Sequence, residues 1–239
     1  MTLLAAHLND AGLLITDGER ILCREPGYAL LKDDGLVTGR AAWATASLEP
    51  RRTKNHYWDD LRTASLADAR FQHLTAADLV STQLETLWQR VAKPGDRLAL
   101  AVPGYMNAEN LGLLLGIAMD LDIPVVAMVD AAVAATRRQY KNAVPVHVDL
   151  SLHSTMLTRL QQEGQAQYER SAIVDEAGML DLYGIWLRMI AESFVQQSRF
   201  DPLHTAETEQ MLQDRMLDWL AIASTRETVP IEIEYRGIA

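Results

Sequence analysis

Residues 98–136, LALAVPGYMNAENLGLLLGIAMDLDIPVVAMVDAAVAAT, decide the fold of this chain. The stretch opens with an apolar run over residues 98–102 and closes with a second apolar run over residues 125–129, followed by an Ala-rich helical segment. A helical pattern over about residues 107–119 lies between the two runs. Near-continuous apolar runs are typical of parallel strands that are buried on both faces. The stretch therefore predicts a parallel strand–helix–strand unit.

Working outward, the hydrophobic pattern predicts an α/β protein in two lobes, residues 1–143 and 144–239, with an outer subdomain at about 28–97. Further strands are expected over 3–7, 12–16, 19–24, 144–149, 155–160, 167–174 and 230–235, and a hairpin-like region over 27–37. Further helices are expected over 75–91, 179–197 and 205–220, with a short one starting at Gly39. Residues 51–74 have no clear period and are expected to be irregular. In the central helix, Gly112 and Gly116 would allow close packing on the sheet.

The composition excludes several classes of protein. The chain has 239 residues, of which 49% are hydrophobic, enough for a large buried core. Its net charge of −10 argues against nucleic-acid binding, which needs a basic surface. The single cysteine, Cys23, excludes an internal disulfide and a cysteine-based zinc site. No signal peptide and no membrane-length apolar segment are recognisable, so a cytoplasmic protein without membrane contact is expected.

Several short motifs stand in register with one family. Residues 102–107 are Val-Pro-Gly-Tyr-Met-Asn, residues 130–135 are Asp-Ala-Ala-Val-Ala-Ala, residues 39–42 are Gly-Arg-Ala-Ala and residues 147–150 are His-Val-Asp-Leu. In this order they resemble the ATPase domain of the seventy-kilodalton (DnaK-type) heat-shock chaperones, in the actin and sugar-kinase superfamily. The resemblance implies two ribonuclease-H-like α/β lobes with ATP between them. The family continues with a segment carrying a Gly-rich adenosine motif, so the second lobe is expected to be incomplete.

The resemblance also locates two phosphate loops. The family's Asp-Leu-Gly-Thr-Thr corresponds to residues 7–11, and its Asp-Leu-Gly-Gly-Gly-Thr to residues 149–154. Glycines let backbone amides approach phosphates, and none remains in either loop. The family-matched nucleotide positions are His7, Asn9, Asp10, Ala11, Asp149, Ser151, His153 and Ser154.

The catalytic groups of the family are missing as well. The family's lysine corresponds to a position near Trp58, with Lys54 as an offset substitute, and its water-positioning glutamate corresponds to Ala131. The leading hypothesis is therefore a degenerate, chaperone-like pseudo-ATPase with no catalytic residue and no cofactor, acting through a protein partner or self-association. One alternative is a divergent ATPase that binds ATP and uses Asp10, Asp149 and Lys54, with magnesium on Asp149. Another is an N-terminal fragment of a longer chaperone-like protein.

The same residues also allow other chemistry. His7, His153 and Asp149 would be suitable zinc ligands if the fold brought them together, against the simpler interpretation as polar cleft residues. Ser151 and Ser154 near His153 do not favour a hydrolase, because no Gly-x-Ser-x-Gly elbow exists. The aromatic residues of the outer subdomain are either packed core or a partner-binding patch: Trp43, Tyr57 and Trp58.

Overall fold

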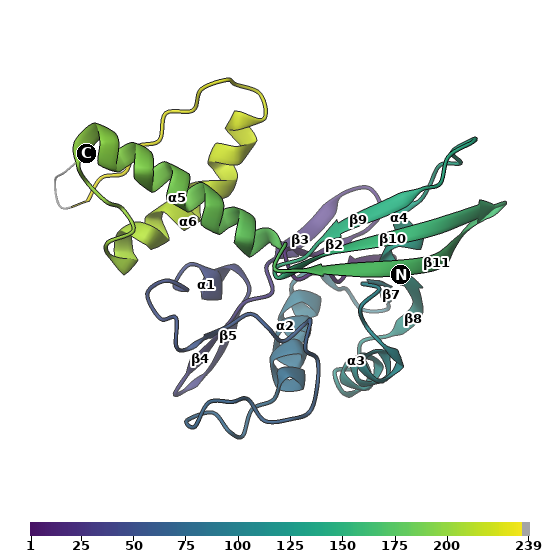
Figure 1. Cartoon of the computed structure of the whole chain (residues 1–239). Coiled ribbons are helices and arrows are strands. Elements are labelled where there is room, and N and C mark those ends of the chain that lie inside the picture. Colours follow the sequence, from purple (N-terminus) through teal and green to yellow (C-terminus); the bar gives the residue numbers. More distant parts are fainter. Residues whose placement is uncertain (236–239) are drawn as a thin grey trace.

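The computed structural model describes residues 1–235 and confirms a mixed α/β protein (Figure 1). The main sheet has the spatial order β3 (Ile21–Glu25), β2 (Leu13–Thr16), β1 (Leu3–His7), β7 (Arg97–Val102) and β8 (Val125–Asp130). The first three strands form an antiparallel meander, and β1, β7 and β8 are parallel. The predicted parallel unit is therefore present at the centre and one side of this sheet.

Helix α3 (Ala108–Asp120) connects β7 to β8. It begins where expected because the Asn107 side chain accepts hydrogen bonds from two backbone amides of the first turn. The expected role of its glycines is wrong. A Cβ at Gly112 or Gly116 would meet nothing within 4 Å, and the side that packs inward is formed by Leu114, Ile117 and Ala118.

Strand β8 also differs from the expectation of burial on both faces. It is the edge strand of the sheet, and Val126 and Val129 are 48% and 38% exposed. The short helix α4 (Ala131–Ala135) follows it, with Asp130 accepting from the amides of Ala132 and Val133. An apolar run can thus form a strand with one open face.

Helix α2 (Ala76–Val91) supplies much of the hydrophobic core that packs on the main sheet. Thr75 caps its first turn, as predicted, in a reciprocal pair with Asp78. Its buried side contributes Leu79, Leu84 and Leu87 to a cluster that continues through the strands of the main sheet. The cluster includes the buried thiol of Cys23 on β3.

The outer subdomain contains a small sheet of β5 (Gly35–Thr38), β4 (Ala29–Lys32) and β6 (Thr53–Lys54), next to helix α1 (Arg40–Trp43). Strand β6 belongs to the segment that was expected to be irregular. The aromatic residues of this part are packed core and not an exposed patch, because Tyr57 and Trp58 are fully buried and Trp43 is 9% exposed.

The rest of the chain forms an antiparallel sheet of β9 (Val146–Leu150), β10 (Ser154–Glu163) and β11 (Gln165–Asp175), then α5 (Met179–Ser198) and α6 (Ala206–Ala223). The two helices pack together on the far side of the molecule from the free end of this sheet (Figure 1).

The predicted strand over 230–235 is wrong for residues 230–234, which have no regular secondary structure, whereas Tyr235 takes part in a β-bridge. Ile233 instead belongs to the buried apolar cluster that also contains Leu212 and Trp219 of α6. Residues 236–239 of the predicted second lobe lie outside the described part of the chain, and the proposed lobe boundary near 141–145 stays a prediction.

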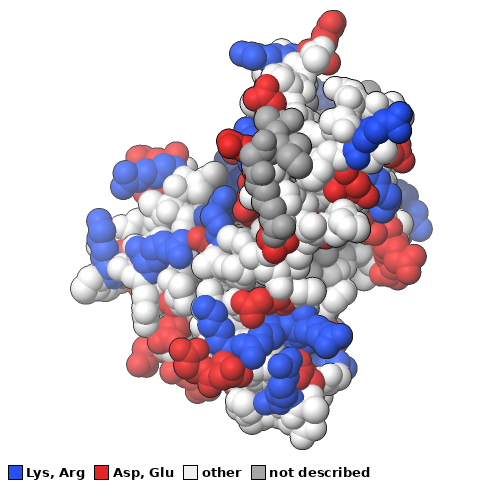
Figure 2. Space-filling view, turned by 90° about the vertical axis from the view of Figure 1, so that its left-hand side faces the viewer, with Lys and Arg blue, Asp and Glu red and all other residues white. Residues whose placement is uncertain are grey.

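The surface carries charges of both signs. On the face drawn in Figure 2, basic side chains lie next to acidic ones, including those in the lower half of the view. Within residues 1–235, every helix is too short or too polar to traverse a bilayer.

Candidate functional site

The two sequence-predicted loops meet directly. One is the turn that follows β1, and the other is the turn between β9 and β10. The Asn9 side-chain amide donates to Asp149 Oδ1 at 2.6 Å and to the Leu150 carbonyl oxygen at 3.0 Å. The backbone amide of Leu152 donates to Asp10 Oδ1 at 2.8 Å. Side chains of the first loop therefore bind the second loop without any intervening group.

Asp149 is held as a carboxylate. Burial raises its pKa, but the hydrogen bond from Asn9 and the electrostatic interactions with His7 and His147 outweigh burial and leave the pKa below the usual value. His7 Nε2 lies 3.9 Å from Asp149 Oδ2. Both carboxylate oxygens of Asp149 therefore have protein partners, namely Asn9 and His7.

Asp10 lies deeper and is fully buried. Loss of solvation raises its pKa to about 7, the Leu152 amide opposes the shift, and the negative charge of Asp59 adds to it. Its Oδ2 atom is buried without a hydrogen-bond partner among the described residues. Gly27 donates its backbone N–H to the Asp10 carbonyl oxygen at 2.6 Å, and an added Cβ there would lie 2.9 Å from Asp10 Cβ.

The serines of the second loop stabilise a tight turn. Ser151 Oγ donates to the Ser154 carbonyl oxygen at 2.8 Å, and the Ser151 backbone amide donates to the same oxygen at 2.9 Å. The carbonyl oxygens of Ser151 and Leu152 accept from the amides of Met179 and Leu180, which open helix α5. The first turn of α5, a position suited to an anion, is thus occupied by protein backbone.

A cavity of about 280 Å³ lies beside this junction. Its polar wall comes from His7 and Asn9, and Ala11 lines it as well. Its apolar wall includes Trp43 and Tyr183, which stack with ring centroids 6.2 Å apart. The cavity therefore lies between α1 and α5.

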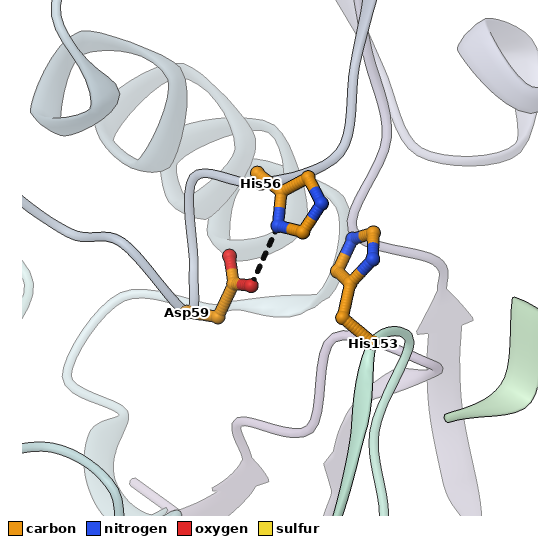
Figure 3. Close-up of side chains that lie close together, drawn as sticks. All are labelled: His56, Asp59 and His153. Atoms are coloured by element: carbon orange, nitrogen blue, oxygen red, sulfur yellow. Dashed lines mark hydrogen bonds and ion pairs between the residues drawn. The ribbon is translucent and has the colours of Figure 1, made fainter. Parts of the chain in front are cut away.

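His153 points away from this group, so the predicted cluster of His7, His153 and Asp149 is not formed. The His153 ring instead stacks on the ring of His56, with centroids 3.3 Å apart (Figure 3). His56 Nδ1 lies 2.8 Å from Asp59 Oδ2. The structure thus divides the predicted ligands between two sites, with His7 and Asp149 in one and His153 in the other.

His56 and Asp59 are site residues that sequence reasoning missed. They lie in the segment of residues 51–74, which has no periodicity to indicate where its side chains point. The spacing His-x-x-Asp was the available signal, although such short spacings are common in loops. Together with His153 they line a cavity of about 500 Å³.

The remaining predicted chemical groups lie elsewhere. Lys54 Nζ is 3.4 Å from Asp68 Oδ2 and donates to the Arg51 carbonyl oxygen, so its charge is used on the surface of the outer subdomain. Trp58 donates its indole N–H to buried Gln83. Ala131 is buried in the first turn of α4. None of these described residues supplies a base or a cation to the two loops.

Comparison with known proteins gives no further assignment. Neither a scan of protein-family models nor a search of curated protein sequences finds a match to this chain.

Proposed function

We propose that this protein is a degenerate nucleotide-binding-fold domain, a pseudo-ATPase related in architecture to the actin-like and heat-shock chaperone ATPases, which acts through protein contacts. One observation carries the proposal. The loops that correspond to the family's phosphate loops are bound to each other by Asn9 and Asp149 and by Asp10 and Leu152. The groups of the two loops that would face phosphates are thereby engaged with each other.

The topology supports the proposed relationship. A three-stranded antiparallel meander followed by two parallel strands, in the order β3-β2-β1-β7-β8, is the arrangement expected of a ribonuclease-H-like lobe. The turn after β1 and the turn after β9 come together, as the two phosphate loops would in such a fold. The relationship rests on this arrangement and on the sequence motifs.

The electrostatics of the junction oppose a triphosphate. The Leu152 amide, which could cradle a phosphate oxygen, donates to Asp10. The lowered pKa of Asp149 keeps a negative charge at the same place, and Lys54 is directed to Asp68. Entry of ATP would require the hydrogen bonds of Asn9 and Asp10 to break, and each buried group that lost its partner would cost about 1–3 kcal/mol.

Titration calorimetry with ATP and Mg²⁺ tests the pseudo-ATPase. The expected result is no heat of binding and no phosphate release, both in the wild type and in Asp149→Ala. The divergent ATPase would be supported instead by micromolar binding together with turnover that disappears in Asp149→Ala and in Lys54→Ala. ATP binding is also measured for the double variant Asn9→Gly/Asp10→Thr, which restores two family residues to the first loop. If it gains ATP binding, the closed loops are the reason that the wild type does not bind.

The surface that fits a protein contact is the open face of the β9–β11 sheet. Met156, Thr158 and Leu160 on β10 are buried, whereas the alternate residue Leu157 is 37% exposed. Leu157 pairs with Val148 on β9, which is 60% exposed. The exposed apolar residues of this face are Val146, Val148, Leu157, Ala172 and Val174. An uncovered apolar sheet face is typical of an interaction surface.

Sedimentation velocity of the wild type and of Val148→Asp/Leu157→Asp tests this part of the proposal. If copies of the chain associate through the face, the wild type forms a larger species at increasing concentration and the double variant stays a monomer. Gln161→Asp/Gln167→Asp, on the same two-stranded ribbon, is the control. If the wild type stays monomeric, the partner of this face would be a different protein and not a second copy of the chain. If such a partner bound both double variants equally well, this face would be excluded as its binding surface.

A further inference from the structure

We propose that His56, Asp59 and His153 form a zinc-binding site that links the two lobes. Each side chain offers one ligand atom, and these atoms all lie within 4.8 Å of one another. Two imidazole nitrogens and a carboxylate oxygen are a ligand set that zinc accepts, with a fourth position left for water. Figure 3 shows the His56 ring between the Asp59 carboxylate and the His153 ring, so that the three side chains converge.

The distances fit a site that closes on the metal with small side-chain rotations. Zinc ligands lie about 2.0–2.2 Å from the ion, so two ligand atoms of a tetrahedral site are about 3.3 Å apart. His56 Nδ1 and Asp59 Oδ2, at 2.8 Å, are already near this spacing, and an ion would replace the shared proton. The His56 side chain is 62% exposed and has room to turn away from the stacked position.

The second imidazole is prepared as a neutral ligand. His153 Nε2 lies 3.2 Å from the Asn55 carbonyl oxygen, which can only accept, so Nε2 carries the hydrogen and Nδ1 keeps its lone pair. A backbone carbonyl in this outer position is typical of metal-binding histidines.

Unsatisfied polar atoms surround the same point. Within the described residues, Asp59 Oδ1 and the Tyr105 hydroxyl are buried and have no hydrogen-bond partner. Both residues line the 500 Å³ cavity, which also receives three further acidic residues: Asp175, Glu176 and Asp181. A cation would compensate the oxygen of Asp59, and the acidic wall would raise the local concentration of cations. The cavity also leaves space for the fourth ligand.

The three ligands come from two separate segments of the chain, so a bound ion would connect these segments. His56 and Asp59 belong to the long segment of the first lobe between β6 and α2, and His153 belongs to the β9–β10 turn. A bound ion would therefore join these segments beside the Asn9–Asp149 contact, and it would stabilise the folded chain by mass action.

The test is a zinc titration of the chelator-treated full chain against a chromophoric zinc indicator. The wild type is expected to bind a single equivalent with submicromolar affinity. His56→Ala, Asp59→Ala and His153→Ala should each weaken binding by at least about tenfold. His73→Ala removes an exposed histidine elsewhere and serves as the matched control. His7→Ala distinguishes the site from a cluster on Asp149, and it should leave the affinity unchanged.

Thermal unfolding gives the second readout. Zinc should raise the melting temperature of the wild type and of His73→Ala but not that of His56→Ala, whose exposed side chain can be removed without unfolding the protein. Wild-type protein that shows no tight binding would overturn the proposal. So would affinity that falls in His7→Ala, or affinity and thermal shift that persist in both His56→Ala and Asp59→Ala.

Discussion

The side-chain amide of Asn9 lies 2.6 Å from the Asp149 carboxylate, across a sequence separation of 140 residues. The same amide reaches the Leu150 carbonyl oxygen, so one side chain satisfies two acceptors of the opposite loop. An amide is suited to this position because it donates to Asp149 without carrying a charge of its own. This contact makes the junction of the two loops a fixed part of the fold.

Replacement of Asn9 should destabilise the protein in a pH-dependent way. Asn9→Ala removes the donor and should lower the free energy of unfolding by about 1–2 kcal/mol. Asn9→Asp puts a second carboxylate against Asp149, and mutual repulsion raises the upper of the two pKa values of the pair above that of an acid in the unfolded chain. Stability should therefore fall as pH rises through the range in which the pair ionises. Urea denaturation at pH 4 and pH 8 measures the difference, and equal losses for Asn9→Asp at both pH values would contradict the expectation.

Asp10 should make the wild type less stable at alkaline pH. Its folded-state pKa is about 7, against 3.8 for the free side chain, so the folded chain holds a proton that the unfolded chain has released. Its contribution to stability is therefore lost as pH rises from about 4 to about 7 and does not change further above that range. Asp10→Asn keeps an oxygen for the Leu152 amide and removes the titration.

The expected result for Asp10→Asn is a gain of about 1–3 kcal/mol relative to the wild type at pH 8, which disappears near pH 4. Denaturant unfolding across this pH range gives the measurement. Asp33→Asn, an exposed carboxyl on the surface of the outer subdomain, is the control and should show no comparable pH-dependent gain. A constant difference between Asp10→Asn and wild type at all pH values would show that Asp10 does not titrate in this range.

Sequence periodicity was sufficient for the elements with a strong local signal. Helix α2 begins at the predicted cap Thr75, and the parallel unit of β7, α3 and β8 has its predicted order. Periodicity failed where long-range packing decides. Ile231 and Ile233 alternate as in a strand, but they pack into the apolar cluster of α5 and α6, and neither residue belongs to a strand.

The site was predictable only where the loops follow regular strands. Asn9 and Asp149 lie near the ends of β1 and β9, which belong to different sheets, and the expectation that their loops are related came from the family resemblance. The partners of His153 were not predictable because His56 and Asp59 lie in an aperiodic segment whose path is fixed by burial of the adjacent Tyr57 and Trp58. A side-chain direction that depends on remote packing leaves no periodic signal in the sequence.

Gly178 should be required for docking of α5 on the second loop. An added Cβ would overlap the Leu152 carbonyl oxygen and lie 2.6 Å from His153 Cα. Gly178→Ala should therefore lower the free energy of unfolding by about 1–3 kcal/mol and displace the first turn of α5. Gly112→Ala is the matched control, because its Cβ would meet no atom and alanine favours the helix by about 0.5–1 kcal/mol. Tryptophan fluorescence reports displacement through Trp43, which stacks on Tyr183 of α5.

Gln83 should be the polar residue of the first lobe that tolerates substitution least. Its side-chain oxygen accepts from the Tyr57 hydroxyl at 2.6 Å and from the Trp58 indole N–H at 2.8 Å, and its nitrogen donates to the Pro26 carbonyl oxygen at 2.8 Å. Every atom of this network is buried, and the indole N–H can only donate, which fixes the orientation of the amide.

Gln83→Leu would leave the Tyr57 hydroxyl and the Trp58 indole N–H buried without this acceptor and would remove one of two hydrogen bonds to the Pro26 carbonyl oxygen, so it should lower the free energy of unfolding by about 2–5 kcal/mol. Gln89→Leu changes the same residue type on an exposed position of the same helix, and it should change stability by no more than about 0.5 kcal/mol. Gln83→Glu can still accept from Tyr57 and Trp58 but cannot donate to Pro26 and carries a buried charge, so it should also destabilise the chain. If Gln83→Glu matched the wild type at neutral pH, the bond to the Pro26 carbonyl oxygen would have no energetic importance. Denaturant unfolding of these three variants therefore distinguishes the hydrogen bonds that the Gln83 oxygen accepts from the one that its nitrogen donates.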